Sequence, residues 1–220
     1  MRLLCLLETR VLGVLVEKAL TVPDSYPLSL NSLTLGCNQK TARDPVLQAS
    51  ESDVQLAVDA LKGLHLVFEA SGSRVTRHEH NLGRALVLPS QSVALLAVLM
   101  LRGPQTASEL RANCERLHRF ADLSSVEGFL EELAQRAQDK GGPLVLKLAR
   151  APGSREARWA HLLSGAPAPG AIDPLPEGDD FLPASELAAL KANQALLQGE
   201  VADLRRLVER LYGELGIARE

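Results

Sequence analysis

The sequence predicts a mainly α-helical chain with small β-hairpins, an α+β fold class, that ends in a coiled-coil helix. Two observations predict the body of the fold. A run of three helical segments followed by a hairpin occurs twice, and aromatic residues make up only 3% of a chain dominated by Leu, Ala and Val. This composition favours an aliphatic, mainly helical core. The third observation is a heptad pattern of leucines that follows a proline-rich stretch near the C-terminal end.

The first run occupies residues 1–86. Apolar residues at helical spacing, such as Leu7, Val11 and Leu15, predict its first helix. Ser50 begins a capping-box pattern that opens the third helix. The helices are expected at about residues 4–20, 29–38 and 50–64, and the strands of the hairpin at 66–70 and 74–80.

The second run, residues 87–164, repeats this order. Capping-box patterns begin at Thr106 and Ser124, and Ser124 follows Ser50 by 74 residues. The helices are expected at about residues 91–101, 106–117 and 124–137, and the strands at 144–149 and 155–162. Three helices and a hairpin make a winged helix, so the repeat predicts two tandem winged-helix domains. The alternative is one all-helical domain with incidental hairpins.

Length and composition limit the classes of protein. A chain of 220 residues that is 46% hydrophobic and 23% charged has room for one or two domains with ordinary cores. Its three cysteines are odd in number and far apart, which argues against a disulfide framework or a zinc site and favours a reducing compartment. Glu8 and Arg10 interrupt the first apolar run, and the run at residues 93–101 is far shorter than the roughly 20 residues that span a bilayer. We therefore expect a soluble, cytoplasmic protein with no membrane partner.

Charge is divided unevenly along the chain. Residues 1–163 carry 19 Lys and Arg against 17 Asp and Glu, a net charge of +2, whereas residues 164–220 carry 5 against 10, a net charge of -5. The affinity of a protein for nucleic acid grows with the number of phosphates that it neutralises. A body so close to neutral is therefore expected to contact nucleic acid only through local basic patches.

The C-terminal part is predicted to be a linker and a dimerisation helix. Residues 165–183 are rich in Ala, Pro, Gly and acidic residues, which is typical of a linker. Residues 184–216 place Leu at heptad positions d and mainly β-branched residues or Leu at a, with the polar Gln194 at one a position. This pattern is typical of a two-stranded parallel coiled coil and predicts a homodimer. The dimerisation residues are Leu187, Leu190, Leu197, Val201, Leu204, Val208, Leu211 and Leu215.

Four motifs carry a resemblance to a known family. They are Glu8-x-Arg10-Val11-Leu12-Gly13, Tyr26-Pro27-Leu28-Ser29-x-Asn31, Cys37-Asn38-Gln39-Lys40-Thr41-x-Arg43-x-Pro45 and Arg102-Gly103-x-Gln105-Thr106-x-x-Glu109-Leu110-Arg111. Over about residues 7–165, the chain resembles the YceH family of uncharacterised bacterial proteins. The resemblance implies a tandem winged-helix fold and a bacterial cytosolic origin, and it brings no established activity.

Contacts with DNA are expected away from the third helices. A winged helix usually places its third helix in the major groove, but here that helix carries Glu51, Asp53 and Asp59 in the first run, and phosphates repel carboxylates. Basic and polar residues instead flank the hairpins and lie in the turn at residues 37–45. The candidate contacts with nucleic acid or a protein partner are Asn38, Gln39, Lys40, Thr41, Arg43, Arg74, Arg77, Arg155 and Arg158. The alternative is that these side chains satisfy helix ends and pair with nearby carboxylates.

The residue patterns favour a binding protein over an enzyme. His78 and His80 share a strand face but have no evident third ligand, so neither a metal nor a cofactor is expected. Cys37 follows an apolar helical run and is typical of a small core residue. One hypothesis is a dimeric protein that binds double-stranded DNA, such as a transcriptional regulator, and the other is a protein-protein interaction or scaffold module. A continuous positive face would support the first, and isolated basic patches beside an exposed apolar groove would support the second.

Overall fold

The computed structural model describes residues 2–70, 75–150 and 154–167. The chain divides into two units, Met1–Asp173 and Pro174–Glu220. All the described residues belong to the first unit. The coiled-coil helix predicted at residues 184–216, with its dimerisation residues, lies outside the described residues, as does most of the predicted linker.

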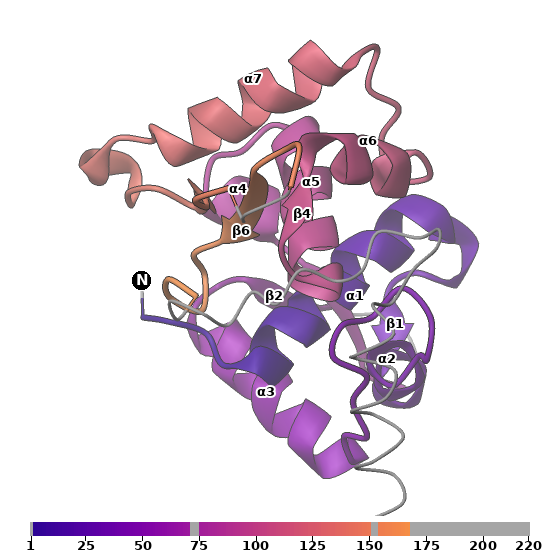
Figure 1. The fold of residues 1–220 in the computed structure, drawn as a ribbon. Helices are drawn as coiled ribbons and strands as arrows, with labels where there is room; N and C mark the ends of the chain where they lie inside the picture. Colours follow the sequence, from indigo (N-terminus) through magenta and orange to yellow (C-terminus); the bar gives the residue numbers. More distant parts are fainter. Residues whose placement is uncertain (1, 71–74, 151–153, 168–220) are drawn as a thin grey trace, which may run out of the picture. The chain divides into compact units, whose positions relative to one another are not determined.

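The first half of this unit follows the predicted order of elements (Figure 1). Ser29 caps the second helix by accepting a hydrogen bond from the Ser32 amide, and Ser50 and Asp53 form the predicted capping box of the third helix. The elements are α1 (Leu6–Thr21), a 3₁₀ turn (Pro23–Ser25), β1 (Leu28–Ser29), α2 (Leu30–Cys37), α3 (Glu51–Gly63), β2 (Val67–Ala70), β3 (Arg77–His80) and α4 (Leu82–Ala85).

The second half repeats the order of helices and strands, and its described residues form no counterpart of α4. Thr106 and Glu109 form the predicted capping box at the start of its second helix. The elements are α5 (Ser90–Arg102), β4 (Gln105–Thr106), α6 (Ala107–Cys114), α7 (Leu123–Ala134), a 3₁₀ turn (Gln138–Lys140), β5 (Val145–Lys147) and β6 (Arg158–His161). The structure therefore confirms a mainly helical α+β chain with two small hairpins.

Each half contains a three-stranded antiparallel sheet of the same topology. The strand orders are β1-β3-β2 and β4-β6-β5. Ser29 pairs with Arg77 in the first sheet, and Thr106 pairs with Arg158 in the second. His80 and His161 likewise both face a valine on the neighbouring strand. The register thus makes Arg77 equivalent to Arg158 between the halves.

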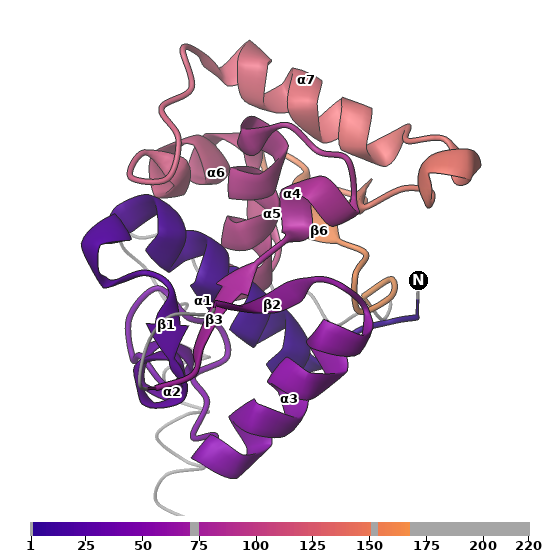
Figure 2. The same cartoon turned by 180° about the vertical axis from the view of Figure 1, so that it is seen from behind.

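Helices α1 and α5 join the two halves (Figures 1 and 2). Both are buried around most of their circumference, as expected for helices that pack on several sides. Gly13 permits a close approach, because a Cβ at this position would lie 3.0 Å from the side chain of Leu101. The Asp44 amide donates a hydrogen bond of 2.8 Å to the carbonyl of Leu101, which ties the turn before α3 to α5.

Local details differ from the sequence expectations. The cap of α7 is Asp122 instead of Ser124, because the Asp122 carboxylate accepts the Ser125 amide at 2.8 Å. Strands β1 and β4 were not predicted, since two residues are too few to show an alternating pattern. The returning strands begin at Arg77 and Arg158, later than expected, where pairing with these short strands starts.

Candidate functional site

The turn at residues 37–45 is held together by Arg43, whose side chain has no exposed surface. As a candidate contact with a partner, this side chain would have to be at least partly exposed, and the structure shows that it is not. Its Nη1 and Nη2 atoms donate to the two carboxylate oxygens of Glu17 on α1 at 3.1 and 2.6 Å. Three further bonds reach Gly36 O, Ala42 O and the side chain of Gln39. A guanidinium group has five N–H donors, so every donor of Arg43 is already used within the chain.

The side-chain amides of Asn38 and Gln39 also form hydrogen bonds within the chain. The Asn38 side chain donates to the carbonyl of Ala49 and accepts from its amide, each at 2.8 Å. Gln39 accepts the bond from Arg43 at 2.6 Å. Lys40 and Thr41, in contrast, are exposed, and Lys40 forms no ion pair with any residue that the structure describes. Most of the polar side chains in this turn thus form hydrogen bonds within the chain, as the alternative interpretation of the sequence states. Of the five candidate contacts in the turn, only Lys40 and Thr41 are exposed.

A second buried arginine supports the same turn from α1. Arg10 is fully buried and donates to the carbonyls of Cys37 at 3.0 Å and Pro45 at 2.6 Å, at the two ends of the turn. Its Nε atom is buried without a partner among the described residues. Burial and the positive charge of Arg43 lower the pKa of Arg10 below its ordinary value. Two buried cations therefore fix the path of the chain between α2 and α3.

The strand arginines form a repeated internal contact. Arg77 Nη1 donates to the carbonyl of Pro27 at 2.7 Å, and Arg158 Nη1 donates to the carbonyl of Pro104 at 3.0 Å. Each arginine thus holds the residue that precedes the short first strand of its own sheet. Arg158 also pairs with Glu109 at 3.3 Å. Among the other hairpin candidates, Arg155 is exposed and Arg74 lies outside the described residues.

The third helix of each half presents carboxylates outward, as the sequence predicts. Glu51, Asp53 and Asp59 are exposed on α3. Glu127 and Glu131 are exposed on α7. Negative charge on both helices opposes their insertion into a DNA groove.

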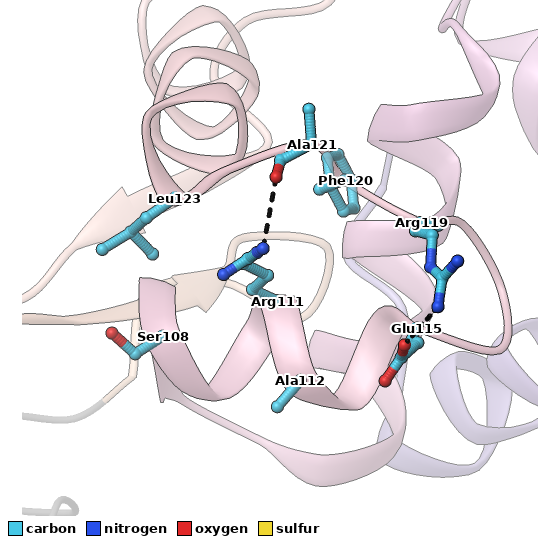
Figure 3. Close-up of a pocket in the computed structure, with 8 residues that line it drawn as sticks. All are labelled: Ser108, Arg111, Ala112, Glu115, Arg119, Phe120, Ala121 and Leu123. Carbon is cyan, nitrogen blue, oxygen red and sulfur yellow. Dashed lines mark hydrogen bonds and ion pairs between the residues drawn. The ribbon is translucent and has the colours of Figure 1, made fainter.

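A pocket of about 720 Å³ lies between α6 and the segment that leads to α7 (Figure 3). Arg111 points across it and donates to the carbonyl of Ala121 at 3.2 Å, while Arg119 pairs with Glu115 at 3.1 Å on the surface. Arg116 is exposed in the same segment. Sequence reasoning missed these arginines, although three of them within nine residues, at the end of the second helix and just after it, were a visible signal.

A shallower groove of about 500 Å³ lies between the start of α1, residues 47–49 and α3. Leu6 and Leu56 are 48% and 69% exposed there. Its two charged lining residues are both acidic: Glu8 is bound by Arg2, and Asp53 is exposed. The apolar lining residues are Cys5, Leu6, Leu7, Leu47, Ala49, Leu56 and Ala57. Sequence reasoning missed this groove too. The sequence feature that could have indicated it is Leu56, an apolar residue on the otherwise polar face of α3.

Burial shifts the pKa values of several cysteines and histidines away from their ordinary values. Burial raises the pKa of the Cys37 and Cys114 thiols to about 12, so both remain protonated near neutral pH. Burial lowers the pKa of His78 and His80, and that of His161 to about 4. Within residues 2–70, 75–150 and 154–167, no group of three or more His, Cys, Asp or Glu side chains is placed to hold a metal ion. No helix in the same ranges combines the length and hydropathy that crossing a membrane requires.

Comparisons with known proteins place the chain in a family. A family model described as "Protein of unknown function, DUF480" matches residues 4–154. The chain is 62% identical to a UPF0502 protein of Methylibium petroleiphilum, across 99% of this chain and 92% of that protein. It is 61% identical to a UPF0502 protein of Paraburkholderia phytofirmans, across 98% and 91% of the two chains. It is 59% identical to one of Burkholderia pseudomallei strain K96243, across 96% and 88%. The chain therefore belongs to the UPF0502 (DUF480) family of uncharacterised bacterial proteins.

Proposed function

We propose that the chain is a non-enzymatic protein-interaction module built from two winged-helix units. The repeated order of elements supports the winged-helix assignment, because each half has a helix, a short strand, two helices and a hairpin that pairs with the short strand. A fold of this kind does not fix the function, so the proposal depends on what the surfaces offer.

The observation that carries the proposal is the exposed apolar groove beside an acidic α3. Leu56 is 69% exposed in a position that lines this groove together with Leu6 and Leu47. Contiguous exposed apolar side chains are typical of a surface that meets another protein. The exposed carboxylates of Glu51 and Asp59 on the same helix would repel a phosphate backbone. A polypeptide suits this surface better than a nucleic acid does.

The basic side chains that the sequence predicts as DNA contacts also favour a protein partner, because several of them already form hydrogen bonds within the chain. Arg43 has no free N–H donor, and Arg77 and Arg158 each hold a proline carbonyl. Turning one of these side chains fully toward a phosphate gives up internal hydrogen bonds, and the carbonyls left unpaired are buried or partly buried. In the described part of the chain, the exposed cations of the predicted set are Lys40 and Arg155, which lie in different halves of the unit.

A site-specific cross-link tests the proposal in living bacterial cells. A photo-reactive amino acid in place of Leu56 is expected to give a discrete adduct with another polypeptide. The matched control is the same substitution at Leu146, which is 41% exposed on β5 of the other half and should give no such adduct. Absence of an adduct at position 56, or identical adducts from both positions, would contradict the proposal.

DNA binding is the second candidate function, and the pocket between α6 and α7 favours it. Arg111 and Arg119 line this pocket, Arg116 is exposed between them in sequence, and Lys147 and Arg155 are exposed on the hairpin of the same half. Titration against a random duplex at low and high salt decides this candidate. Binding that weakens steeply with salt, and weakens further when Arg111, Arg116 and Arg119 are replaced by Ala, supports it. Salt-independent or absent binding refutes it.

A further inference from the structure

We propose that the pocket between α6 and the segment that leads to α7 binds a small organic acid, a single carboxylate attached to an apolar or aromatic body. The site lies in the second half of the unit, so the inference is independent of the groove beside α3 and of the interaction function proposed above. It follows from one arginine with free donors, from the apolar wall beside that arginine and from a comparison of the two halves.

The two halves close the same junction in different ways. In both, the second helix ends at a buried cysteine, and an alanine precedes the cap of the third helix. In the first half, the Asn38 side chain forms two hydrogen bonds of 2.8 Å with the backbone of that alanine, Ala49. In the second half, the corresponding carbonyl of Ala121 accepts one bond of 3.2 Å from Arg111, beside a pocket of about 720 Å³. Fewer hydrogen bonds therefore hold the second junction closed.

Arg111 keeps most of its hydrogen-bond donors free in this pocket (Figure 3). A guanidinium group has five N–H donors, and the bond to Ala121 uses one of them at the long end of the usual range. Arg111 forms no ion pair with any residue that the structure describes, whereas the neighbouring Arg119 is paired with Glu115. The planar guanidinium group of an arginine can bind both oxygens of one carboxylate.

The wall beside Arg111 is apolar. Its apolar lining residues are Ala112, Phe120, Ala121 and Leu123. The ring of Phe120 makes edge contacts with the rings of His118 and Phe129, at centroid distances of 4.7 and 6.1 Å. The pocket volume lies within the roughly 300–1,000 Å³ range of small-molecule sites, which combine an apolar lining with a few polar groups that orient the ligand. The pocket therefore suits an apolar body whose carboxylate reaches Arg111.

The charges around the pocket favour one carboxylate over a polyanion. Two arginines and one glutamate line the pocket, a net charge of +1. Just outside the lining, Arg116 is exposed, Glu156 accepts a bond from Ser108 at 2.9 Å, and Asp122 caps α7. Together these six ionised side chains carry no net charge. A polyanion that depends on several neutralised phosphates gains little from such a surface, whereas one carboxylate gains the whole contact with Arg111.

Two aryl carboxylates, 4-phenylbutyrate and 2-naphthylacetate, test the site by titration of the 15N-labelled full chain. We expect at least one of them to saturate with a Kd of about 1 mM or less. The shifted amides should belong to α6 and residues 115–125. The matched neutral probe is the amide of the same acid, which should bind at least about tenfold more weakly because it offers no charge to the guanidinium group. Inorganic phosphate, which has charge but no apolar body, should also bind at least about tenfold more weakly.

Variants test the role of Arg111. Arg111→Gln should weaken the binding of the acid by about tenfold or more and leave the binding of the neutral amide unchanged. Arg111→Lys should recover part of the affinity, because lysine restores the charge but not the planar group. The matched control is Arg116→Gln, which removes an exposed charge from the same segment outside the lining and should change the Kd by no more than about twofold.

Thermal melting checks that each variant folds. If Arg111→Gln melts early, then the comparison of acid with amide on the unmodified chain and the Arg111→Lys variant decide the question. Equal affinity for acid and amide would show that Arg111 does not recognise the charge. Equal affinity for inorganic phosphate would show that the apolar wall does not contribute.

Two other results also overturn the inference. The first is no saturable binding by either acid, or shifts confined to other parts of the chain. The second is displacement of the acid by random duplex DNA, with a steep dependence on salt and equal losses from Arg111→Gln and Arg116→Gln, which assigns these arginines to nucleic acid. Neither result bears on the cross-link at position 56, which tests the interaction function separately.

Discussion

Replacing Arg43 by Ala should destabilise the fold strongly, whereas replacing its neighbour Lys40 should not. The Arg43 side chain is fully buried and pairs with Glu17 at 2.6 Å. Removing one partner of a buried ion pair typically costs about 3–5 kcal/mol, because the other charge stays buried without compensation. Glu17 keeps some solvent contact and lies 3.6 Å from Lys18, so we expect the lower end, about 3 kcal/mol. Lys40 is exposed, and an exposed substitution usually changes stability by no more than about 0.5 kcal/mol.

Urea unfolding followed by circular dichroism measures the difference. A loss of about 3 kcal/mol corresponds to a fall in Tm of roughly 6–12 °C for a unit of this size. Arg43→Lys should fall between the wild type and Arg43→Ala, because lysine restores the charge but not the planar five-donor contact. If Arg43→Ala is as stable as Lys40→Ala to within about 0.5 kcal/mol, then the buried network does not hold the turn and the reasoning is refuted.

Three further predictions concern packing, pH and assembly. Gly36→Ala should lower the free energy of unfolding by about 1–3 kcal/mol, because its Cβ would lie 2.6 Å from a side-chain carbon of α1. The control is Gly63→Ala, whose Cβ would meet nothing within 4 Å and which should leave the melting temperature unchanged or raise it. Burial lowers the pKa of His161 from 6.5 to about 4, so the folded state holds this side chain neutral. The contribution of His161 to the free energy of unfolding is therefore complete above pH 6.5 and is lost as pH falls toward 4. That loss amounts to roughly 3 kcal/mol, and a His161→Gln variant with an unchanged pH slope of stability would contradict it. The full chain should form a concentration-dependent dimer through residues 184–216 in sedimentation equilibrium, and a truncation that lacks them should be monomeric; an equally dimeric truncation would exclude this helix as the dimerisation element.

Much of the helical framework could be predicted from the sequence because its signals are local. The caps at Ser50 and Thr106 act on an amide three residues away, so a short stretch of sequence contains the whole interaction. The acidic surface of α3 could also be predicted, because the helical period alone places Glu51, Asp53 and Asp59 away from the apolar face. The cap of α7 was misplaced by two residues because Asp122 and Ser124 both suit this role, and the backbone geometry decides between them.

The candidate site was predicted less well because its contacts are distant in sequence. Arg43 meets Glu17 across 26 residues, and Arg10 meets Pro45 across 35. A polar turn with two basic residues looks the same in sequence whether those residues face solvent or a buried carboxylate. The groove likewise exists only because α1, residues 47–49 and α3 come together.

By itself, the sequence determined the longer helices, the caps of α3 and α6, the repeated order of helices and hairpins and the sign of charge on each third helix. Only the tertiary structure decided which cations are exposed and where apolar surface remains uncovered. The physical reason lies in the range of the interactions. Helix caps and apolar periodicity act within one or two turns, whereas the burial of Arg43 and the exposure of Leu56 depend on which distant segment packs beside them.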